Sequence, residues 1–330
     1  MPGGMGPVSL TMVLASALLG AAAEPSFAPA NPHGCQACEL VQPKQFNLPT
    51  GDYPPPWELE YENSKAFAAE KAASRGHINR GFDDPFVVFE HRLLFCKIAK
   101  VASSGWLRLL RRMEGHASWA VNPYFMSPDG YVGGLRQMSH LSHAEALRVL
   151  RDSRNWTRIV IVRDPAERLL SAFLDKVHKP SESKTQIKIY SEELFGLPRS
   201  EFANVTFADF VERVAYGLTH SIVDQHWSLL SDQCDLRNWL PAYDLVIKMR
   251  PGDGMNEMLD CVLTAVARRS SNPTRLTELR DTFNLTSRVA SNHATTTEKK
   301  YYTPQLLQRV MAMYAEDYAL FNLPMPTGLL

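Results

Sequence analysis

The chain has 330 residues, with 35 Lys plus Arg balanced by 35 Asp plus Glu. Hydrophobic residues make up 45% and charged residues 21%, which is typical of a globular protein and disfavours wholesale disorder, a collagen, a coiled coil or a disulfide-rich miniprotein. Zero net charge also argues against a general nucleic-acid binder, which is normally basic overall.

The middle of the chain concentrates the positive charge. Residues 100–190 carry 15 basic and 8 acidic side chains, whereas residues 1–99 and 191–330 carry net charges of −3 and −4. An anion-binding cleft requires such a bias, because a local excess of cations attracts anionic ligands. Arg-rich helix faces in solvent would explain the same counts equally well.

The N-terminal segment resembles a secretory signal. Residues 1–23 carry no charged side chain, and residues 8–23 are all apolar or small. This run is short for a membrane span and fits the core of a signal peptide, with a small-residue cleavage site before Glu24. An uncleaved signal anchor is the alternative. No later stretch is long and apolar enough to predict another membrane span.

The rest of the chain divides into a stem and a main domain. Residues 24–85 are rich in proline and are interpreted as a stem or irregular wrap, with a helical pattern at 63–74. The main domain is predicted to span residues 86–330. Sequons at Asn155, Asn204 and Asn284 support exposure to the secretory lumen.

Five cysteines fit an oxidising compartment. They lie at positions 35, 38, 96, 234 and 261. Proximity in the sequence predicts that Cys35 pairs with Cys38 and Cys234 with Cys261, which leaves Cys96 free. No second Cys or His pair at ligand spacing accompanies Cys35 and Cys38, so we expect neither a zinc site nor a redox motif there.

Strand-like and helix-like segments alternate along the main domain. Apolar runs predict buried strands at 93–98, 157–162 and 243–249. The expected helices are 105–113, one starting at Ser142 with a capping box to Glu145, one capped by Asp164 with Pro165 in its first turn, and helices at 206–217, 255–268 and 303–320. Residues 115–140 are predicted to be loop. This order predicts an α/β fold with a central, mainly parallel sheet flanked by helices.

The first candidate binding segment joins the first of these strands to the following helix. It reads Cys96-Lys97-Ile98-Ala99-Lys100-Val101-Ala102-Ser103-Ser104-Gly105-Trp106. Small side chains let backbone N–H groups approach an anion, and the helix N-terminus favours negative charge. The two serines add hydroxyl donors, and Lys100 adds a positive charge. A purely structural βα turn explains this composition as well.

The second candidate segment follows the strand predicted at 157–162. It reads Arg163-Asp164-Pro165-Ala166-Glu167-Arg168-Leu169-Leu170-Ser171. Ligands of open α/β sheets bind at the carboxyl ends of strands, and Arg suits bidentate phosphate contact. For Arg163, the alternative is a structural salt bridge. For Arg168, it is pairing with a nearby carboxylate such as Asp164.

In this order and spacing, the two segments resemble the Golgi carbohydrate sulfotransferases of the sulfotransferase family 2 type, which include the chondroitin, dermatan and HNK-1 enzymes. The first resembles their 5′-phosphosulfate loop and the second their 3′-phosphate motif. The likeness spans roughly residues 91–323 and continues through 205–211, Gln225-His226-Trp227, Gln233-Cys234, 243–248, Tyr301-Tyr302, Tyr314, Asp317-Tyr318 and Phe321.

The chain departs from the family pattern at several positions. Ala99 stands where the family usually has Pro, and Ser103 and Gly105 replace Cys and Asn. Ala166 replaces Phe, and the second Cys of a Leu-Cys-x-x-Cys segment is missing. These departures leave open a second class of function, a luminal or secreted binding protein on a catalytically degenerate sulfotransferase fold.

The resemblance implies a P-loop-like sulfotransferase fold and sulfate transfer from 3′-phosphoadenosine 5′-phosphosulfate to a glycan hydroxyl in the Golgi lumen, without a metal. The implied donor-binding residues are Ala99, Lys100, Val101, Ala102, Ser103, Ser104, Gly105, Arg163 and Ser171. Lys100 is expected to stabilise the departing oxygen as negative charge grows on it. His226 is the first candidate for the general base, because imidazole titrates near neutral pH.

Some assignments remain open at this point. His140 and His143 rival His226 as the base, and Trp106 is expected either beside the nucleotide or in the helix core. Lys176, Lys179, Lys184 and Lys188 line a path for an anionic acceptor or form a solvated basic face. We expect a glycan as the partner, no nucleic acid, and membrane contact only through an uncleaved N-terminal segment.

Overall fold

The computed structural model describes residues 84–128, 130–178, 189–202, 204–220, 224–249, 254–283 and 300–326. Several predictions lie outside these residues: the N-terminal signal, nearly all of the stem with its helix at 63–74, Cys35, Cys38, Asn284, Lys179, Lys184 and Lys188.

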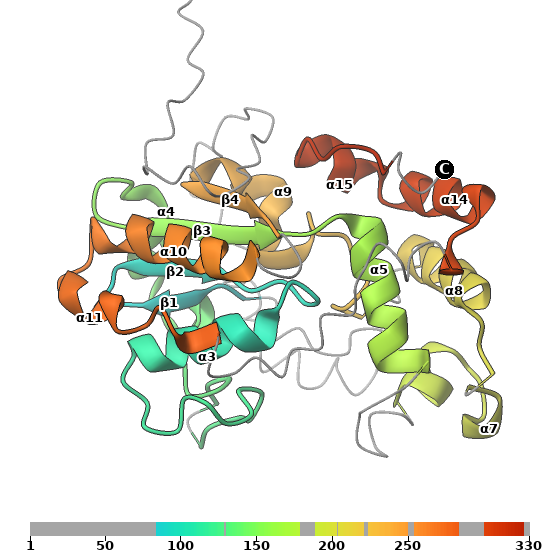
Figure 1. Cartoon of the computed structure of the whole chain (residues 1–330), viewed down its shortest axis with the longest axis horizontal. Helices are drawn as coiled ribbons and strands as arrows, with labels where there is room; N and C mark the ends of the chain where they lie inside the picture. Colours follow the sequence, from blue (N-terminus) through green and yellow to red (C-terminus); the bar gives the residue numbers. More distant parts are fainter. Residues whose placement is uncertain are drawn as a thin grey trace, which may run out of the picture. The chain divides into compact units, whose positions relative to one another are not determined.

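A four-stranded sheet forms the centre of the fold (Figure 1). In spatial order its strands are β1 (Phe86–Val88), β2 (Leu93–Cys96), β3 (Thr157–Val162) and β4 (Leu245–Lys248). β1 is antiparallel to β2, whereas β2, β3 and β4 run parallel. The predicted α/β fold with a mainly parallel sheet flanked by helices is confirmed, although the sequence analysis missed the short strand β1.

Helices cover both faces of the sheet. Alternate strand residues such as Phe95 and Ile159 pack on α3 (Ser103–Met113) and α10 (Gly254–Ala267). On the opposite face, strand residues such as Leu94 pack on α4 (His143–Arg151) and α9 (Leu236–Trp239). All six residues of β3 are buried, as expected for a strand that is covered on both sides.

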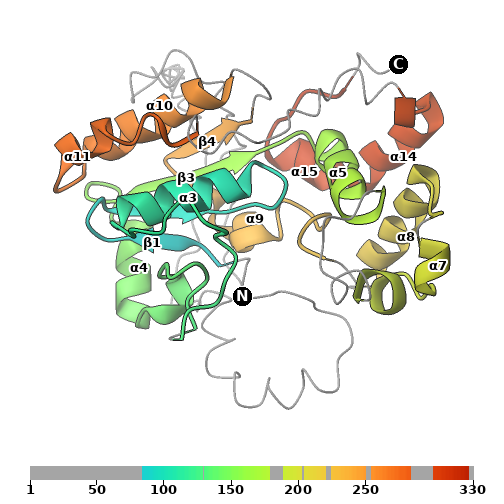
Figure 2. The same ribbon diagram turned by 60° about the horizontal axis from the view of Figure 1, so that its bottom comes forward.

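Three helices pack together beyond the carboxyl ends of the strands: α5 (Pro165–Phe173), α8 (Phe207–Thr219) and α14 (Pro304–Met313) (Figures 1 and 2). The ring of Phe173 lies 5.2 Å from that of Phe207, between ring centroids. α14 is followed by α15 (Ala315–Leu320). The single helix predicted over 303–320 is therefore wrong: the backbone leaves helical geometry at Tyr314, with φ −107° and ψ 22°.

Shorter elements complete the described part of the chain. They are η2 (Met138–His140), η3 (Leu174–His178), η4 (Ile189–Leu194), α7 (Arg199–Phe202), η5 (Gln233–Asp235), η6 (Leu240–Ala242) and α11 (Pro273–Thr277). No helix among the described residues is long and apolar enough to cross a membrane.

Side-chain caps fix the starts of the helices where the sequence predicted them. Asp164 accepts hydrogen bonds from the N–H groups of Ala166 and Glu167 at 2.9 and 3.1 Å, and Ser142 forms a capping box with Glu145. These caps satisfy N–H groups that have no partner inside a helix. Both predicted helix starts are therefore confirmed.

The predicted pairing of Cys234 with Cys261 is wrong, and so is the expectation of a free Cys96. Cys96 forms a disulfide with Cys234, with their Cα atoms 6.0 Å apart, and Cys261 is disulfide-bonded to a partner other than Cys234. The pairing departs from proximity in the sequence because Cys96 ends β2, and the sheet brings that end beside the turn at Cys234, which has a left-handed φ of 51°. The disulfide thus joins the start of the first candidate segment, at the end of β2, to the chain that follows His226.

Candidate active site

The loop after β2 has a backbone suited to an anion. Lys100 and Ala102 adopt φ values of 68° and 59°, in the left-handed region that non-glycine residues rarely occupy. α3 then begins without a side-chain cap at Ala102 and without an acidic residue in its first turn. The N–H groups at such a helix N-terminus favour a bound anion, so the loop fits the predicted contact with a phosphate group.

Gly105 and Trp106 connect this loop to the core. A Cβ atom at position 105 would lie 2.4 Å from the ring of Phe283, so the Asn that is usual in the resembling family could not fit without moving that ring. Trp106 is fully buried, with ring centroids 4.8 Å from Phe283 and 5.7 Å from Phe95. Of the two expectations for Trp106, the helix core is therefore the one observed.

The hydroxyl groups of Ser103 and Ser104 meet at a third hydroxyl group. Tyr124 Oη lies 2.8 Å from Ser103 Oγ and 2.9 Å from Ser104 Oγ. Tyr124 is partly exposed, but desolvation of its hydroxyl group raises its pKa, so this phenol keeps its proton at neutral pH. Three hydroxyl groups thus cluster at the N-terminus of α3.

The two candidate segments meet where β2 and β3 end. Arg163 Nη1 donates a hydrogen bond to the carbonyl of Lys100 at 3.3 Å, and Arg163 Nε pairs with Glu167 at 3.1 Å. Within the described residues, the remaining guanidinium nitrogen Nη2 makes no hydrogen bond. Of the two expectations for Arg163, the structure shows the salt bridge, with Glu167, and leaves contact with an anion as a prediction.

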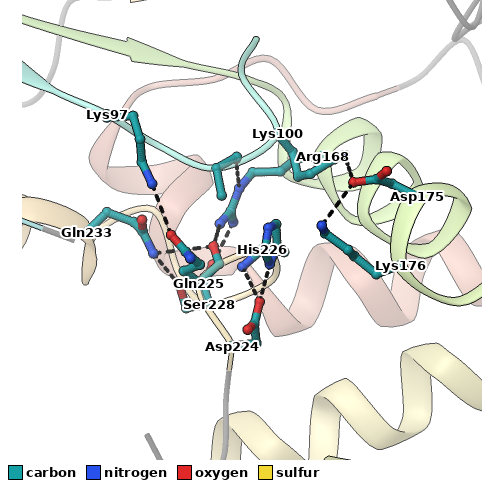
Figure 3. A network of polar contacts seen from close by, with 11 residues as sticks. Lys97, Lys100, Arg168, Asp175, Lys176, Asp224, Gln225, His226, Ser228 and Gln233 are labelled. Atoms are coloured by element: carbon teal, nitrogen blue, oxygen red, sulfur yellow. Dashed lines mark hydrogen bonds and ion pairs between the residues drawn. The ribbon is translucent and has the colours of Figure 1, made fainter. Parts of the chain in front are cut away.

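Lys100 and Lys176 share one carboxylate. Lys100 Nζ lies 2.8 Å from Asp175 Oδ2, and Lys176 Nζ lies 3.4 Å from the same oxygen (Figure 3). Burial lowers the pKa of Lys100, and Asp175 opposes this effect. Burial also raises the pKa of Asp175, but the charge and hydrogen bond of Lys100, together with the charges of Lys176 and His226, outweigh burial and keep that pKa low. Lys176 is buried here, so it is not part of a solvated basic face.

Arg168 ties three parts of the site together. Its guanidinium donates to the backbone carbonyls of Ala99 at 3.0 Å, Ser228 at 2.6 Å and Gln225 at 2.6 Å (Figure 3). Lys97, also buried, donates to the side chain of Gln225 at 3.0 Å. The first candidate loop is thus held against the turn that carries His226, and these three contacts of Arg168 are with backbone carbonyls rather than with the carboxylate considered above.

His226 lies in this turn and is paired with Asp224. Its Nδ1 and its backbone N–H both contact Asp224 Oδ1, the backbone contact at 2.8 Å. Burial lowers the pKa of His226, with Lys176 and Lys100 adding to the effect and Asp224 opposing it. Burial raises the pKa of Asp224, but His226 holds it below its usual range. A neutral imidazole that donates from Nδ1 to a carboxylate keeps Nε2 as its proton acceptor.

The other candidates are placed differently. His140 Nδ1 accepts the backbone N–H of Gln137 in the turn before α4, and His143 begins that helix. Ser171 is half-buried on α5, and among the described contacts no hydrogen bond joins it to Lys100 or Arg163. The structure thus brings Lys100, Arg163 and His226 into one network, while His140 has a local structural partner.

The C-terminal helices support both halves of the network. Tyr318 Oη donates to Asp164 at 3.2 Å, next to Arg163, and Tyr314 Oη donates to the carbonyl of Trp227 at 2.5 Å, next to His226. The buried Asp317 accepts the backbone N–H of Leu230 at 2.8 Å. Tyr314, Asp317 and Tyr318, which were noted above only as part of the resemblance to the family, therefore help to position the site.

Sequence reasoning missed three polar residues of the site. Asp224 stands two positions before His226, a spacing that lets a carboxylate reach the imidazole. Asp175 directly precedes Lys176 on the chain after α5. Tyr124 gave no signal, because it lies in a loop whose path depends on tertiary contacts. Among the described residues, no group of three or more His, Cys, Asp or Glu side chains is arranged to hold a metal ion.

Comparisons with known proteins identify a family and several relatives that are similar to this chain. The model of the sulfotransferase family matches residues 83–324. Human carbohydrate sulfotransferase 8 is 25% identical over 79% of this chain and 59% of its own length, and human carbohydrate sulfotransferase 9 is 28% identical over 45% and 34%. Human carbohydrate sulfotransferase 10 is 34% identical over 39% of this chain and 37% of its own length. No solved structure matches.

The matches thus span about one third to three fifths of each of these relatives. The matched range, 83–324, begins just before β1 and ends after α15, so it includes every residue of the network described above.

Proposed function

Because the chain belongs to the sulfotransferase family, we propose that it transfers sulfate from 3′-phosphoadenosine 5′-phosphosulfate to a hydroxyl group of a glycan. The observation that carries the proposal is the contact of Arg163 Nη1 with the carbonyl of Lys100 at 3.3 Å. It joins the guanidinium of Arg163 to the backbone of Lys100 where two neighbouring strands end, which supports a single site for both ends of a doubly phosphorylated nucleotide.

The residues present fit such a donor. Residues 99–105 would hold its 5′ end with backbone N–H groups and hydroxyl groups, and Arg163 and Ser171 would hold its 3′-phosphate. The bound donor would supply an activated sulfuryl group with a phosphate as its leaving group. Lys100 stands ready to stabilise negative charge on that phosphate, since Asp175 holds its ammonium at the loop rather than in solvent.

His226 is proposed as the general base. Its low pKa, caused first by burial, keeps the imidazole neutral at pH 7, and Asp224 fixes its tautomer by accepting the Nδ1 proton. Nε2 would take the proton of the acceptor hydroxyl as that oxygen bonds to sulfur. Asp224 would then stabilise the imidazolium that forms, as the third member of a catalytic triad does.

The secretory pathway, with the Golgi lumen as the site of action, is the proposed location. Two observations support it. The disulfide between Cys96 and Cys234 requires an oxidising environment to persist. Asn155 and Asn204, in two of the three sequons, are exposed, so both can carry glycans. Whether the chain is a type II membrane protein or soluble after cleavage depends on the N-terminal segment, as the sequence analysis set out.

A transfer assay with labelled donor and a panel of neutral and anionic glycans tests the proposal. The wild-type protein is expected to label at least one glycan, and Lys100→Ala is expected to abolish labelling while the circular dichroism spectrum stays the same. Lys300→Ala, which removes an exposed lysine elsewhere, serves as the matched control. Nucleotide binding without any transfer would instead favour a binding protein on the same fold, and full activity of Lys100→Ala would remove this lysine from the mechanism.

A further inference from the structure

Four large apolar side chains are exposed within six positions of the loop that follows α3. Val121, Tyr124, Phe125 and Met126 are 37–57% exposed. They are four of the seven large hydrophobic side chains exposed in the described part of the chain. Exposed apolar side chains gathered in this way indicate a candidate contact site for a ligand or partner.

Arginines of α3 hold this loop from beneath. Arg108 Nε donates to the carbonyl of Ala120 at 3.1 Å, and the fully buried Arg111 donates from Nη1 to the carbonyl of Trp119 at 3.3 Å. The guanidinium carbon of Arg111 also lies 5.1 Å from the ring centroid of Phe125. These contacts fix the loop backbone, while the ring of Phe125 remains 41% exposed.

Backbone contacts also fix the second half of the loop, at Val132 and Gly133. The N–H of Gly133 donates to the carbonyl of Phe125 at 2.7 Å, and Met126 forms an isolated bridge with Val132. Gly133 has a φ of +62°, and a Cβ atom there would lie 2.6 Å from the carbonyl oxygen of Pro123. The exposed side chains are therefore presented by a fixed backbone, as a preorganised binding surface requires.

Tyr124 places this surface next to the donor loop. Its hydroxyl group contacts both Ser103 and Ser104, at the N-terminus of α3. Desolvation of this hydroxyl group raises the pKa of Tyr124, and the charge of Asp175 adds to the rise, so the hydroxyl group lies within electrostatic range of the carboxylate that binds Lys100. Asp175 in turn lies within electrostatic range of His226.

Building on the sulfate transfer proposed above, we propose that Tyr124, Phe125 and Met126 form an acceptor subsite, on which the C–H face of a pyranose ring of the glycan packs. Aromatic rings and a thioether offer flat, polarisable surface to C–H groups, while the hydroxyl groups of the sugar project away from it. A ring held there lies beside the loop predicted to bind the sulfate-bearing end of the donor. A protein partner that needs only apolar surface is the competing occupant.

The test measures glycan binding and turnover separately. Methyl β-glycosides of galactose, N-acetylgalactosamine, N-acetylglucosamine and glucuronic acid are titrated into the full chain saturated with adenosine 3′,5′-bisphosphate, with saturation-transfer NMR as the readout. The variants are Phe125→Ala and Met126→Ala, with Phe125→Tyr as a conservative rescue. Tyr216→Ala removes an aromatic side chain that is 59% exposed on α8 and is the matched control.

Phe125→Ala is expected to weaken binding of the preferred glycoside, and to raise its KM in transfer, by about three- to ten-fold, the usual effect of one lost aromatic stacking contact. Phe125→Tyr and Tyr216→Ala are expected to match the wild type, and nucleotide affinity is expected to stay constant throughout. Unchanged glycoside binding in both alanine variants, or an equal loss of nucleotide affinity, overturns the acceptor subsite. So does a wild-type protein that binds the nucleotide but none of the glycosides. A wild-type protein that binds no nucleotide and transfers no sulfate overturns the proposed function itself.

Discussion

The pairing of Asp224 with His226 makes Asp224→Asn an informative substitution. The amide oxygen can still accept the Nδ1 proton, so orientation is retained while the negative charge is lost. A charge-assisted hydrogen bond is roughly twice as strong as a neutral one, so we expect a loss of about 1–2 kcal/mol in transition-state stabilisation, or about 5- to 30-fold in kcat. His226→Ala removes the base itself and is expected to cost about 10²- to 10⁴-fold.

The direction of the pH dependence follows from the contacts. Asp224 raises the pKa of His226 against a larger lowering by burial, so the folded value lies below the ordinary 6.5. The kcat of the wild type is therefore expected to fall on the acid side only below that value, as His226 becomes protonated. Removing the carboxylate lowers this pKa further, so Asp224→Asn shifts the acid limb to still lower pH.

Steady-state sulfate transfer across pH 4.5–8, about 3.5 units that span the ordinary pKa of histidine, measures both effects. If Asp224 acts through His226, the double variant loses no more kcat than His226→Ala alone, because the two act as one unit. Asp260→Asn, on the exposed surface of α10, is the matched control. Multiplicative losses in the double variant, or an acid limb that does not move, would refute the positioning role of Asp224.

Two further predictions concern the donor site and the disulfide. Arg163→Ala should weaken the binding of adenosine 3′,5′-bisphosphate by about 1–3 kcal/mol, the value of a charged hydrogen bond, in isothermal titration calorimetry. Arg148→Ala, on the exposed side of α4, should leave that affinity unchanged, and equal affinities for all three proteins would contradict the assignment. Cys234→Ser should lower the free energy of unfolding by about 2–5 kcal/mol, because the disulfide with Cys96 closes a loop of 138 residues. An unchanged unfolding midpoint in urea would show that this crosslink contributes nothing to stability.

Local sequence signals predicted much of the fold. Apolar runs located β2, β3 and β4, and Asp164 and Ser142 marked the starts of their helices, because these features depend on neighbours within a few residues. β1 is only three residues long and has too few positions for a periodic pattern. The break at Tyr314 carries no Gly or Pro signal in the sequence, and the residue there makes a contact with the distant Trp227 that no local pattern contains.

The candidate site also contains residues that local sequence patterns could identify and contacts that they could not. Lys100 and Arg163 could be found because each follows a strand, and parallel neighbouring strands bring their carboxyl ends to the same edge. The pairing of Cys96 with Cys234 and the three carbonyl contacts of Arg168 join residues far apart in the chain. Such contacts depend on the path of the whole chain, which no local pattern contains.

Two tyrosines near the C-terminus supply contacts to the site that become available only late in synthesis. Tyr314 braces the carbonyl of Trp227, and Tyr318 braces the carboxylate of Asp164, both from helices translated after every other part of the site. We therefore expect the turns at Arg163 and His226 to become fixed only after the residues that make these two hydrogen bonds have left the ribosome. A product that ends before α14 would contain the residues of both turns but would lack the two tyrosine hydrogen bonds that hold these turns in place.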